Sequence, residues 1–179
     1  MSSMTSSALV VVDMQYDFID GSLACENAEE AVARTVSFIE SFDGPVLFTR
    51  DYHPGNHSSF TDNGGTWPSH CVAGTHGAEI HSALQPFVSE ELCFDKGCDV
   101  AVEQYSGFEG VNQAGQSLAE VLQLLDVQEV CVCGIATEFC VRNTFSDLKN
   151  AGFNVRLLTD CLAWVAREGH EKTLEELGY

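Results

Sequence analysis

Three residues in this sequence have the side chains and positions that covalent catalysis needs. Cys140 lies within "GIATEFCVRNT", directly after the apolar segment "QEVCVCGI", so we expect it in the first turn of a helix that follows a strand. Unpaired backbone N–H groups and the helix dipole lower the pKa of a thiol in that position, and a nearby cation such as Lys96 lowers it further. Asp13 could accept the thiol proton and later donate it to a leaving amine. Residue type alone does not decide for catalysis, because aspartates at strand ends are common helix caps and cysteines in helices are usually core residues.

A second group of residues has the side chains of a metal site. The segment "DYHPGNH" contains Asp51, His53 and His57, and "WPSHC" contains His70. Aspartate and histidine two residues apart can bind one ion from an extended segment, and mixed aspartate and histidine ligands suit zinc, manganese or iron(II). A solvated polar loop is the alternative interpretation, because the Asp-x-His pattern is weak by itself.

Five short apolar segments alternate with amphipathic ones along the chain. The apolar segments predict strands, whereas apolar residues spaced three and four apart predict helices. Asn27 and Thr137 are the candidate N-caps of two of these helices. The alternation predicts an α/β fold: a single domain over residues 1–179, with three α/β/α layers around a mainly parallel sheet of five or six strands. The expected strands are 7–14, 44–51, 90–97, 128–135 and 153–160, and the expected helices are 27–42, 116–127, 137–152 and 168–179.

These elements bring the candidate residues to one edge of the sheet. Ligands of open α/β folds bind beyond the carboxyl ends of the strands. Asp13, Asp51 and Lys96 each end a predicted strand, and Cys140 follows the end of another. The segment 51–89 has few periodic apolar positions, and a loop of that length within a compact domain is usually functional. We therefore expect a metal-binding and substrate-binding loop region over about 51–89, at this edge of the sheet.

The composition argues against several classes of partner. The chain has 27 acidic and 8 basic residues among 179, a formal charge of -19, which argues against nucleic acid and anionic membrane surfaces. No apolar segment approaches the roughly 18–20 residues of a membrane span. The first residues, "MSSMTSS", lack the basic region and long apolar stretch of a signal peptide, so we expect a cytoplasmic protein with reduced cysteines. We expect Cys131 and Cys133 to be buried strand residues rather than metal ligands.

The candidate residues lie in segments that together resemble the nicotinamidases among the isochorismatase-like cysteine hydrolases. The resemblance covers nearly the whole chain. Its specificity comes from the order of the segments, since each one is weak by itself. The segments are "VVVDMQYDF", "TRDYHPGNHSSF", "GGTWPSHCVAGTHGAEIH", "DKG", "YSGF" and "GIATEFCVRNTFSDLKNAGF".

The resemblance implies a role for each candidate residue. It also implies a cis peptide bond at Ile135–Ala136, which would direct the N–H of Ala136, together with that of Cys140, at an oxyanion. His57 is a further candidate ligand, because some members of the family use an additional histidine there and others do not. The implied catalytic triad is Asp13, Lys96 and Cys140, the metal ligands are Asp51, His53 and His70, and the residues of a small aromatic substrate pocket are Phe18, Trp67 and Tyr105.

The activity that the resemblance implies is the deamidation of nicotinamide to nicotinate and ammonia, a step of NAD salvage. It would proceed through a thioester on Cys140, with one divalent metal ion (zinc, or alternatively manganese or iron) positioning the pyridine ring. Many members also accept pyrazinamide. Two alternatives stay open: a related cysteine hydrolase acting on another small amide or urea, and a non-catalytic metal-binding or thiol-redox protein on the same scaffold. A monomer and a homo-oligomer are both compatible with the sequence.

Overall fold

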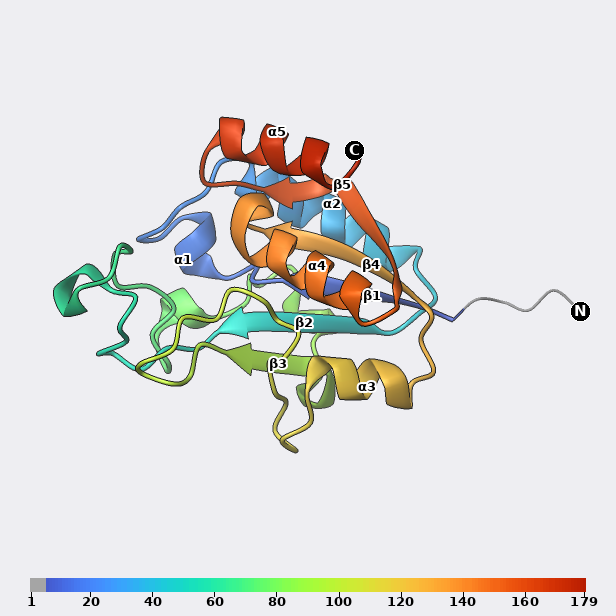
Figure 1. The fold of residues 1–179 in the computed structure, drawn as a ribbon, viewed down its shortest axis with the longest axis horizontal. Coiled ribbons are helices and arrows are strands. Elements are labelled where there is room, and N and C mark those ends of the chain that lie inside the picture. The colour runs from blue at the N-terminus through green and yellow to red at the C-terminus, as the bar shows by residue number, and fades with distance from the viewer. Residues whose placement is uncertain (1–5) are drawn as a thin grey trace, which may run out of the picture.

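A parallel sheet forms the centre of the structure, a computed structural model that describes residues 6–179. Residues 1–5, on which the expectation about a signal peptide rests in part, lie outside the described residues. The sheet order is β3-β2-β1-β4-β5, and every neighbouring pair is parallel (Figure 1). The predicted α/β fold is confirmed, with five strands in the described range. They are β1 (Ser7–Val12), β2 (Val46–Asp51), β3 (Cys93–Lys96), β4 (Glu129–Ile135) and β5 (Asn154–Ala163).

Apolar residues occupy both faces of the central strand β1, as expected for a strand inside a parallel sheet. Successive side chains of a strand point to opposite faces. Leu9 and Val11 therefore pack into one apolar cluster, while Val10 and Val12 pack into the other. All four side chains are fully buried. Such a strand is stable only when helices cover both sides of the sheet.

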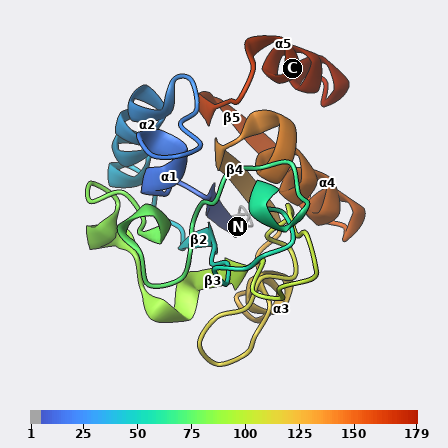
Figure 2. The same cartoon turned by 90° about the vertical axis from the view of Figure 1, so that its left-hand side faces the viewer.

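Helices cover both faces and complete three layers. Figure 2 shows α1 and α2 on one side of the sheet and α3 and α4 on the other. The last helix, α5, packs beside the turn that precedes α4. No helix within residues 6–179 is long and apolar enough to cross a membrane. The helices are α1 (Tyr16–Ile19), α2 (Ala28–Glu40), α3 (Leu118–Leu124), α4 (Arg142–Asn150) and α5 (Arg167–Glu176).

Two helix starts differ from the predicted caps. Asn27 precedes α2 in a left-handed conformation (φ 66°) and does not cap the helix; its side-chain amide donates to Leu162 O at 2.9 Å. Thr137 is not a cap either, because it lies inside a π-helical turn, Thr137–Val141, and its hydroxyl donates to Ala163 O at 3.2 Å. Both side chains instead connect a helix start to the end of β5, a long-range contact that local sequence patterns do not reveal.

The segment between β2 and β3 is a long loop that folds back on itself. It lies beyond the arrowheads of both strands in Figure 1. Isolated bridges pair His53 with Val72 and Phe60 with Trp67. These pairings bring residues from the whole loop to the carboxyl edge of the sheet. Within the loop, short 3-10 turns occupy Thr61–Asn63, His76–Ala78 and Gln85–Phe87.

Candidate active site

Three strand ends bring Asp13, Lys96 and Cys140 together. Lys96 Nζ lies 2.8 Å from Asp13 Oδ2 and 3.5 Å from Cys140 Sγ. The Lys96 ammonium also pairs with the carboxylate of Asp51. All four side chains are buried, and single atoms of Asp13, Asp51 and Cys140 lie within 4.8 Å of one another. The arrangement places a nucleophile, a proton acceptor and a cation in one enclosed space.

The carboxylate of Asp13 is held at both oxygens. The Thr49 hydroxyl on β2 donates to Oδ1 at 2.8 Å, and Lys96 reaches Oδ2. Asp13 has a φ of 50°, a left-handed conformation that aspartate tolerates better than most residues. Its N–H still donates to Thr49 O at 3.0 Å. The two neighbouring strands therefore fix the carboxylate directly after β1 ends.

Cys140 lies in the widened turn between β4 and α4. The N–H of Val141 donates to Ala136 O at 3.1 Å, a bond across five residues that defines a π-helical turn. Such turns are rare and frequently occur at functional sites. The Thr144 hydroxyl donates to Cys140 O at 2.7 Å and connects this turn to α4. The predicted helix over 137–152 is therefore present, but its first turn is wider than an α-helix.

The chain just before this turn approaches β1 closely. Gly134 has a φ of 125°, and a Cβ atom there would lie 2.1 Å from Val12 O. No other residue fits at this position, since the side chain would collide with backbone. The Ile135–Ala136 peptide bond is cis, as the resemblance implies.

Asp51, His53 and His70 form a compact group beside the cysteine. His53 Nε2 and His70 Nε2 lie 3.4 and 3.7 Å from Asp51 Oδ2. The other ring nitrogen of each histidine faces a backbone carbonyl: His53 Nδ1 is 2.8 Å from Gly97 O, and His70 Nδ1 is 2.7 Å from Pro68 O. A carbonyl only accepts hydrogen bonds, so each Nδ1 carries a proton and each Nε2 is the ring nitrogen that faces Asp51 and could bind an ion.

The donor set fits a divalent cation. One ligand atom from each of the three residues lies within 4.8 Å of the others, and all three residues are buried. His53 Nε2 has no hydrogen-bond partner, although buried polar atoms are normally paired. Despite burial, Lys96 and the two histidines hold the pKa of Asp51 well below its usual value, so its carboxylate stays anionic. Two imidazoles and one carboxylate are a common ligand set for such an ion.

His57 lies beside this group without joining it. Its Nδ1 is 2.7 Å from Ser59 Oγ, and its Nε2 is 2.9 Å from Val102 O. Its ring packs against that of His53, with centroids 4.2 Å apart. Both ring nitrogens have protein partners, so this geometry favours a set of three protein ligands over one of four.

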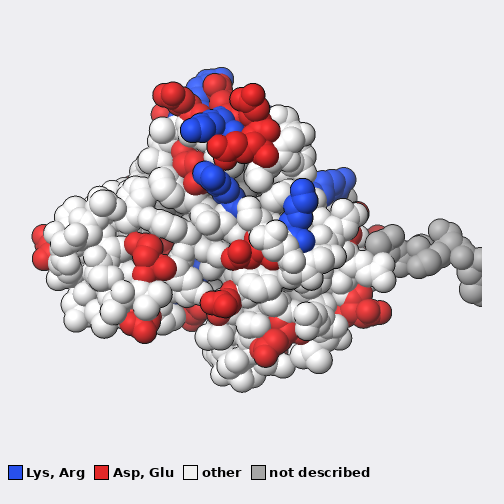
Figure 3. Space-filling view, in the orientation of Figure 1, with Lys and Arg blue, Asp and Glu red and all other residues white. Residues whose placement is uncertain are grey.

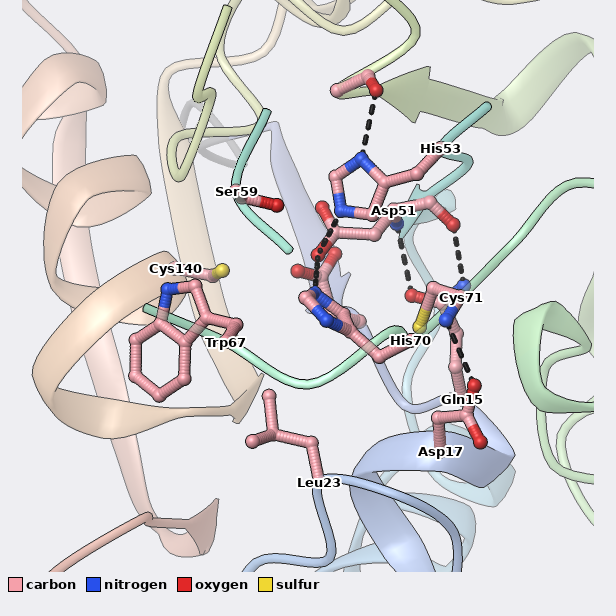
Figure 4. A network of polar contacts seen from close by, with 12 residues as sticks. Gln15, Asp17, Leu23, Asp51, His53, Ser59, Trp67, His70, Cys71 and Cys140 are labelled. Atoms are coloured by element: carbon pink, nitrogen blue, oxygen red, sulfur yellow. Dashed lines mark hydrogen bonds and ion pairs between the residues drawn. The ribbon is translucent and has the colours of Figure 1, made fainter. Parts of the chain in front are cut away.

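A small aromatic pocket borders both the cysteine and the histidine group. Figure 4 shows Cys140 and Trp67 on one side and Asp51, His53 and His70 on the other. Trp67 Nε1 donates to the Tyr105 hydroxyl at 3.0 Å. The structure brings Phe18, Trp67 and Tyr105, all three expected pocket residues, to this space. Its lining comprises Phe18, Leu23, Cys25, Asp51, Trp67, His70, Glu103, Tyr105, Ala136, Phe139, Cys140 and Val165.

Comparison with known proteins agrees with this geometry. The family model described as the isochorismatase domain matches residues 7–178. The chain belongs to the isochorismatase family. A relative within it, the nicotinamidase/pyrazinamidase of Mycobacterium tuberculosis, is 40% identical over 95% of this chain and 93% of its own length. The nicotinamidase resemblance that the sequence motifs indicated is confirmed.

Solved structures of family members have the same fold. The pyrazinamidase of Pyrococcus horikoshii in complex with zinc has a TM-score of 0.87 and 38% identity, with 96% of this chain and 94% of that chain covered. PnC1 from L. infantum in complex with nicotinate has a TM-score of 0.86 and 34% identity, with 97% and 88% covered. A zinc complex among these relatives agrees with a divalent metal site in this isochorismatase-family chain.

Burial governs the protonation of the cysteine in this isochorismatase-family site. It raises the pKa of the Cys140 thiol well above its usual value; Lys96 opposes the rise, while Asp13 and Asp51 add to it. Lys96 acts in the expected direction, but the expected net lowering of this pKa is wrong. The reason is the full burial of the sulfur beside two carboxylates, which local sequence does not show. A protonated resting thiol needs a base during attack, and the pKa of Asp13, raised by burial against the effect of Lys96, suits that task.

Several residues that the sequence analysis did not name support the site. Gln15 donates to Asp51 O at 2.7 Å and to Ala78 O at 2.8 Å, and its own carbonyl accepts from Asp51 N at 2.9 Å. Asp17 accepts from Cys71 N at 2.8 Å, next to His70 (Figure 4). Both residues lie within the "VVVDMQYDF" segment, so the family resemblance included them but did not indicate what they do. The further pocket residues Leu23, Cys25, Glu103 and Val165 lie outside every family segment, whereas Phe139 lies within "GIATEFCVRNT".

Proposed function

We propose that this chain is a nicotinamidase, which hydrolyses the carboxamide of nicotinamide to nicotinate and ammonia within NAD salvage. The observation that carries the proposal is that the Asp13–Lys96–Cys140 group and the Asp51–His53–His70 group lie next to each other along one aromatic pocket. A flat ring that carries an amide on one side and a nitrogen lone pair on the other matches that placement. The names of the relatives, and the nicotinate complex among them, support the same substrate.

The binding of substrate depends on the loop region 51–89 and on the pocket walls. Asp51, His53 and His70 would hold one divalent ion, zinc by preference, which supplies an electrophilic attachment point for the pyridine nitrogen. The rings of Phe18, Trp67 and Tyr105 would enclose the flat substrate. Binding at both ends would leave the carboxamide carbon beside Cys140 Sγ.

The reaction itself would proceed in two halves. In the first, Asp13 takes the proton of Cys140, the sulfur bonds to the carboxamide carbon, and the N–H groups of Ala136 and Cys140 stabilise the oxyanion. Asp13 returns the proton to the nitrogen, the C–N bond breaks, and ammonia leaves a thioester. In the second half, Asp13 deprotonates a water, which attacks the thioester carbon; the C–S bond breaks, and the proton returns to the sulfur. Lys96 stays protonated, because Asp13 and Asp51 raise its pKa despite burial.

The decisive experiment measures ammonia and nicotinate released from nicotinamide by the wild-type chain and by Cys140→Ala. We expect equal amounts of both products from the wild type and none above background from Cys140→Ala. Cys98→Ala is the matched control, because Cys98 is an exposed free thiol outside the pocket. Appreciable turnover by Cys140→Ala would remove the covalent scheme.

Two further measurements address the substrate and the metal. A panel of nicotinamide, pyrazinamide, small aliphatic amides and ureas separates nicotinamidase activity from that of a related amide hydrolase. Thorough chelation should depress the rate, and added zinc should restore it. Full activity of verified metal-free protein would give Asp51, His53 and His70 a structural role instead. The eight free thiols support a reducing compartment, such as the cytoplasm, for this activity.

A further inference from the structure

The pocket that holds Cys140 carries an acidic residue outside the candidate triad and metal ligands. Glu103 lies in the segment after β3, is solvent-exposed, and contributes to the pocket lining. Within residues 6–179 its carboxylate has no hydrogen bond or ion pair. Its charge is therefore neither neutralised by a partner nor needed for packing, unlike that of Asp51.

Among the described residues no lysine or arginine lines the pocket beside this charge, so the only positive charge facing it would be the ion proposed on Asp51, His53 and His70. Lys96 Nζ lies 3.5 Å from Cys140 Sγ, but Lys96 is buried and already paired with Asp13 and Asp51. On the face drawn in Figure 3, Lys and Arg gather over α4 and α5, where Asp and Glu lie among them, whereas the outer part of the loop shows Asp and Glu. An anionic ligand that enters the pocket would meet the Glu103 carboxylate without a free basic side chain to bind it.

The field of Glu103 reaches the pocket wall. Burial, and after it the Glu103 carboxylate, raise the pKa of the Tyr105 hydroxyl, although the hydrogen bond from Trp67 lowers it. A phenol becomes harder to ionise when a negative charge is near. Any second negative charge placed beside Tyr105 would experience the same repulsion.

We propose that Glu103 is a charge filter: it favours uncharged amides over amides that carry a carboxylate, and it weakens the binding of the carboxylate product. This inference rests on the proposed function, because hydrolysis of nicotinamide turns a neutral substrate into an anion of almost the same shape. A pocket can therefore distinguish substrate from product only weakly by shape, but it can distinguish them by their difference of one unit of charge. A partly solvated pair of like charges changes an affinity by about twofold to fivefold.

The test compares wild-type protein with Glu103→Gln, which keeps the shape of the side chain and removes its charge. Inhibition of nicotinamide hydrolysis by added nicotinate gives the inhibition constant of the product, and initial rates give KM for nicotinamide. We expect the inhibition constant of nicotinate to fall about twofold to fivefold in Glu103→Gln at low ionic strength, with KM unchanged. The difference should largely vanish at roughly 1 M salt, where the Debye length is about 3 Å. Glu40→Gln, at the exposed end of α2, is the matched control and should leave both constants unchanged.

Three results would overturn the filter: an unchanged nicotinate constant, a shift that persists in high salt, or an equal shift in KM for nicotinamide. The last two would indicate a change of pocket shape rather than of charge. Calorimetric titration of wild type and Glu103→Gln with nicotinate and with nicotinamide keeps the two proposals separate. If the wild type releases no ammonia from nicotinamide, the proposed function fails. The ratio of the binding constants for nicotinate and nicotinamide, compared between wild type and Glu103→Gln, then still tests the charge filter. Absence of nicotinate binding to Glu103→Gln would also reject the charge filter.

Discussion

Gln15 allows a quantitative test of how the metal-ligand segment is held. Its side chain makes three hydrogen bonds, two to the N–H and C=O of Asp51 and one to Ala78 O, with lengths between 2.7 and 2.9 Å. Gln15 is fully buried, so water does not replace these bonds readily. Gln15→Met keeps a side chain of similar length and removes all three.

We expect Gln15→Met to lower the free energy of unfolding by about 3–5 kcal/mol. A net contribution of roughly 1 kcal/mol per hydrogen bond gives about 3 kcal/mol for three bonds. Each buried backbone group left without a partner adds a penalty of about 1–3 kcal/mol, which small shifts around the flexible methionine relieve in part. The loss is a large share of the roughly 5–15 kcal/mol that stabilises a typical domain.

Urea unfolding of chelated protein measures this difference without a contribution from bound metal. Thr35→Val is the matched control, because it removes one buried hydroxyl, which donates to Ala31 O (2.8 Å) within α2 and otherwise has only a weak contact with Cys133 Sγ at 3.8 Å. That control should lose only about 1 kcal/mol. A loss for Gln15→Met no larger than that of Thr35→Val would refute the reasoning. Because Asp51 is a candidate ligand, Gln15→Met should also bind zinc about tenfold or more weakly.

Three other predictions follow from single contacts. In Gly97→Ala, the new Cβ would lie 2.4 Å from His53 Cε1 at a φ of 67°, so zinc affinity measured by chelator competition should fall about tenfold or more; unchanged affinity contradicts this. Burial lowers the pKa of His170, so the neutral ring stabilises the fold fully above about pH 6.5, and this stabilisation is lost as the pH falls. On acidification, the free energy of unfolding of the wild type should therefore fall more than that of His170→Gln. Equal losses in the two proteins would exclude the effect. Timed alkylation with mass mapping should modify exposed Cys98 before buried Cys25, whose pKa burial raises to about 12, and the reverse order would be inconsistent with the structure.

The sheet could be predicted from the sequence because its strands carry their own signal. β1 is apolar on both faces, a pattern typical of a strand between two helical layers. The boundaries of the helices were less predictable. Asn27 and Thr137 look like caps locally, yet each donates to a carbonyl near the end of β5. Tertiary partners decided these two positions, and no short window of sequence contains them.

In the candidate site, too, some features could be predicted from the sequence and others could not. The end of each strand and the rule that ligands bind there were enough to bring Asp13, Lys96 and Cys140 to one edge. The direction of the thiol pKa was not predictable, because it depends on how completely the fold encloses the sulfur beside two carboxylates. Glu103 had no motif at all, since its importance comes only from the space that it borders.

The position of Lys96 explains how two buried carboxylates remain beside a thiol. Without a cation, carboxylates this close cannot both stay ionised, and one takes up a proton. Lys96 pairs with both Asp13 and Asp51, but the two differ in their other neighbours. His53 and His70 lie 3.4 and 3.7 Å from Asp51 and help Lys96 hold its pKa well below the usual value despite burial, whereas burial raises the pKa of Asp13. Lys96 therefore leaves Asp51 as a fixed anion that can bind a metal, and it leaves Asp13 as a group that can accept and return a proton. Cys140, a buried thiol with a raised pKa, requires such a proton acceptor.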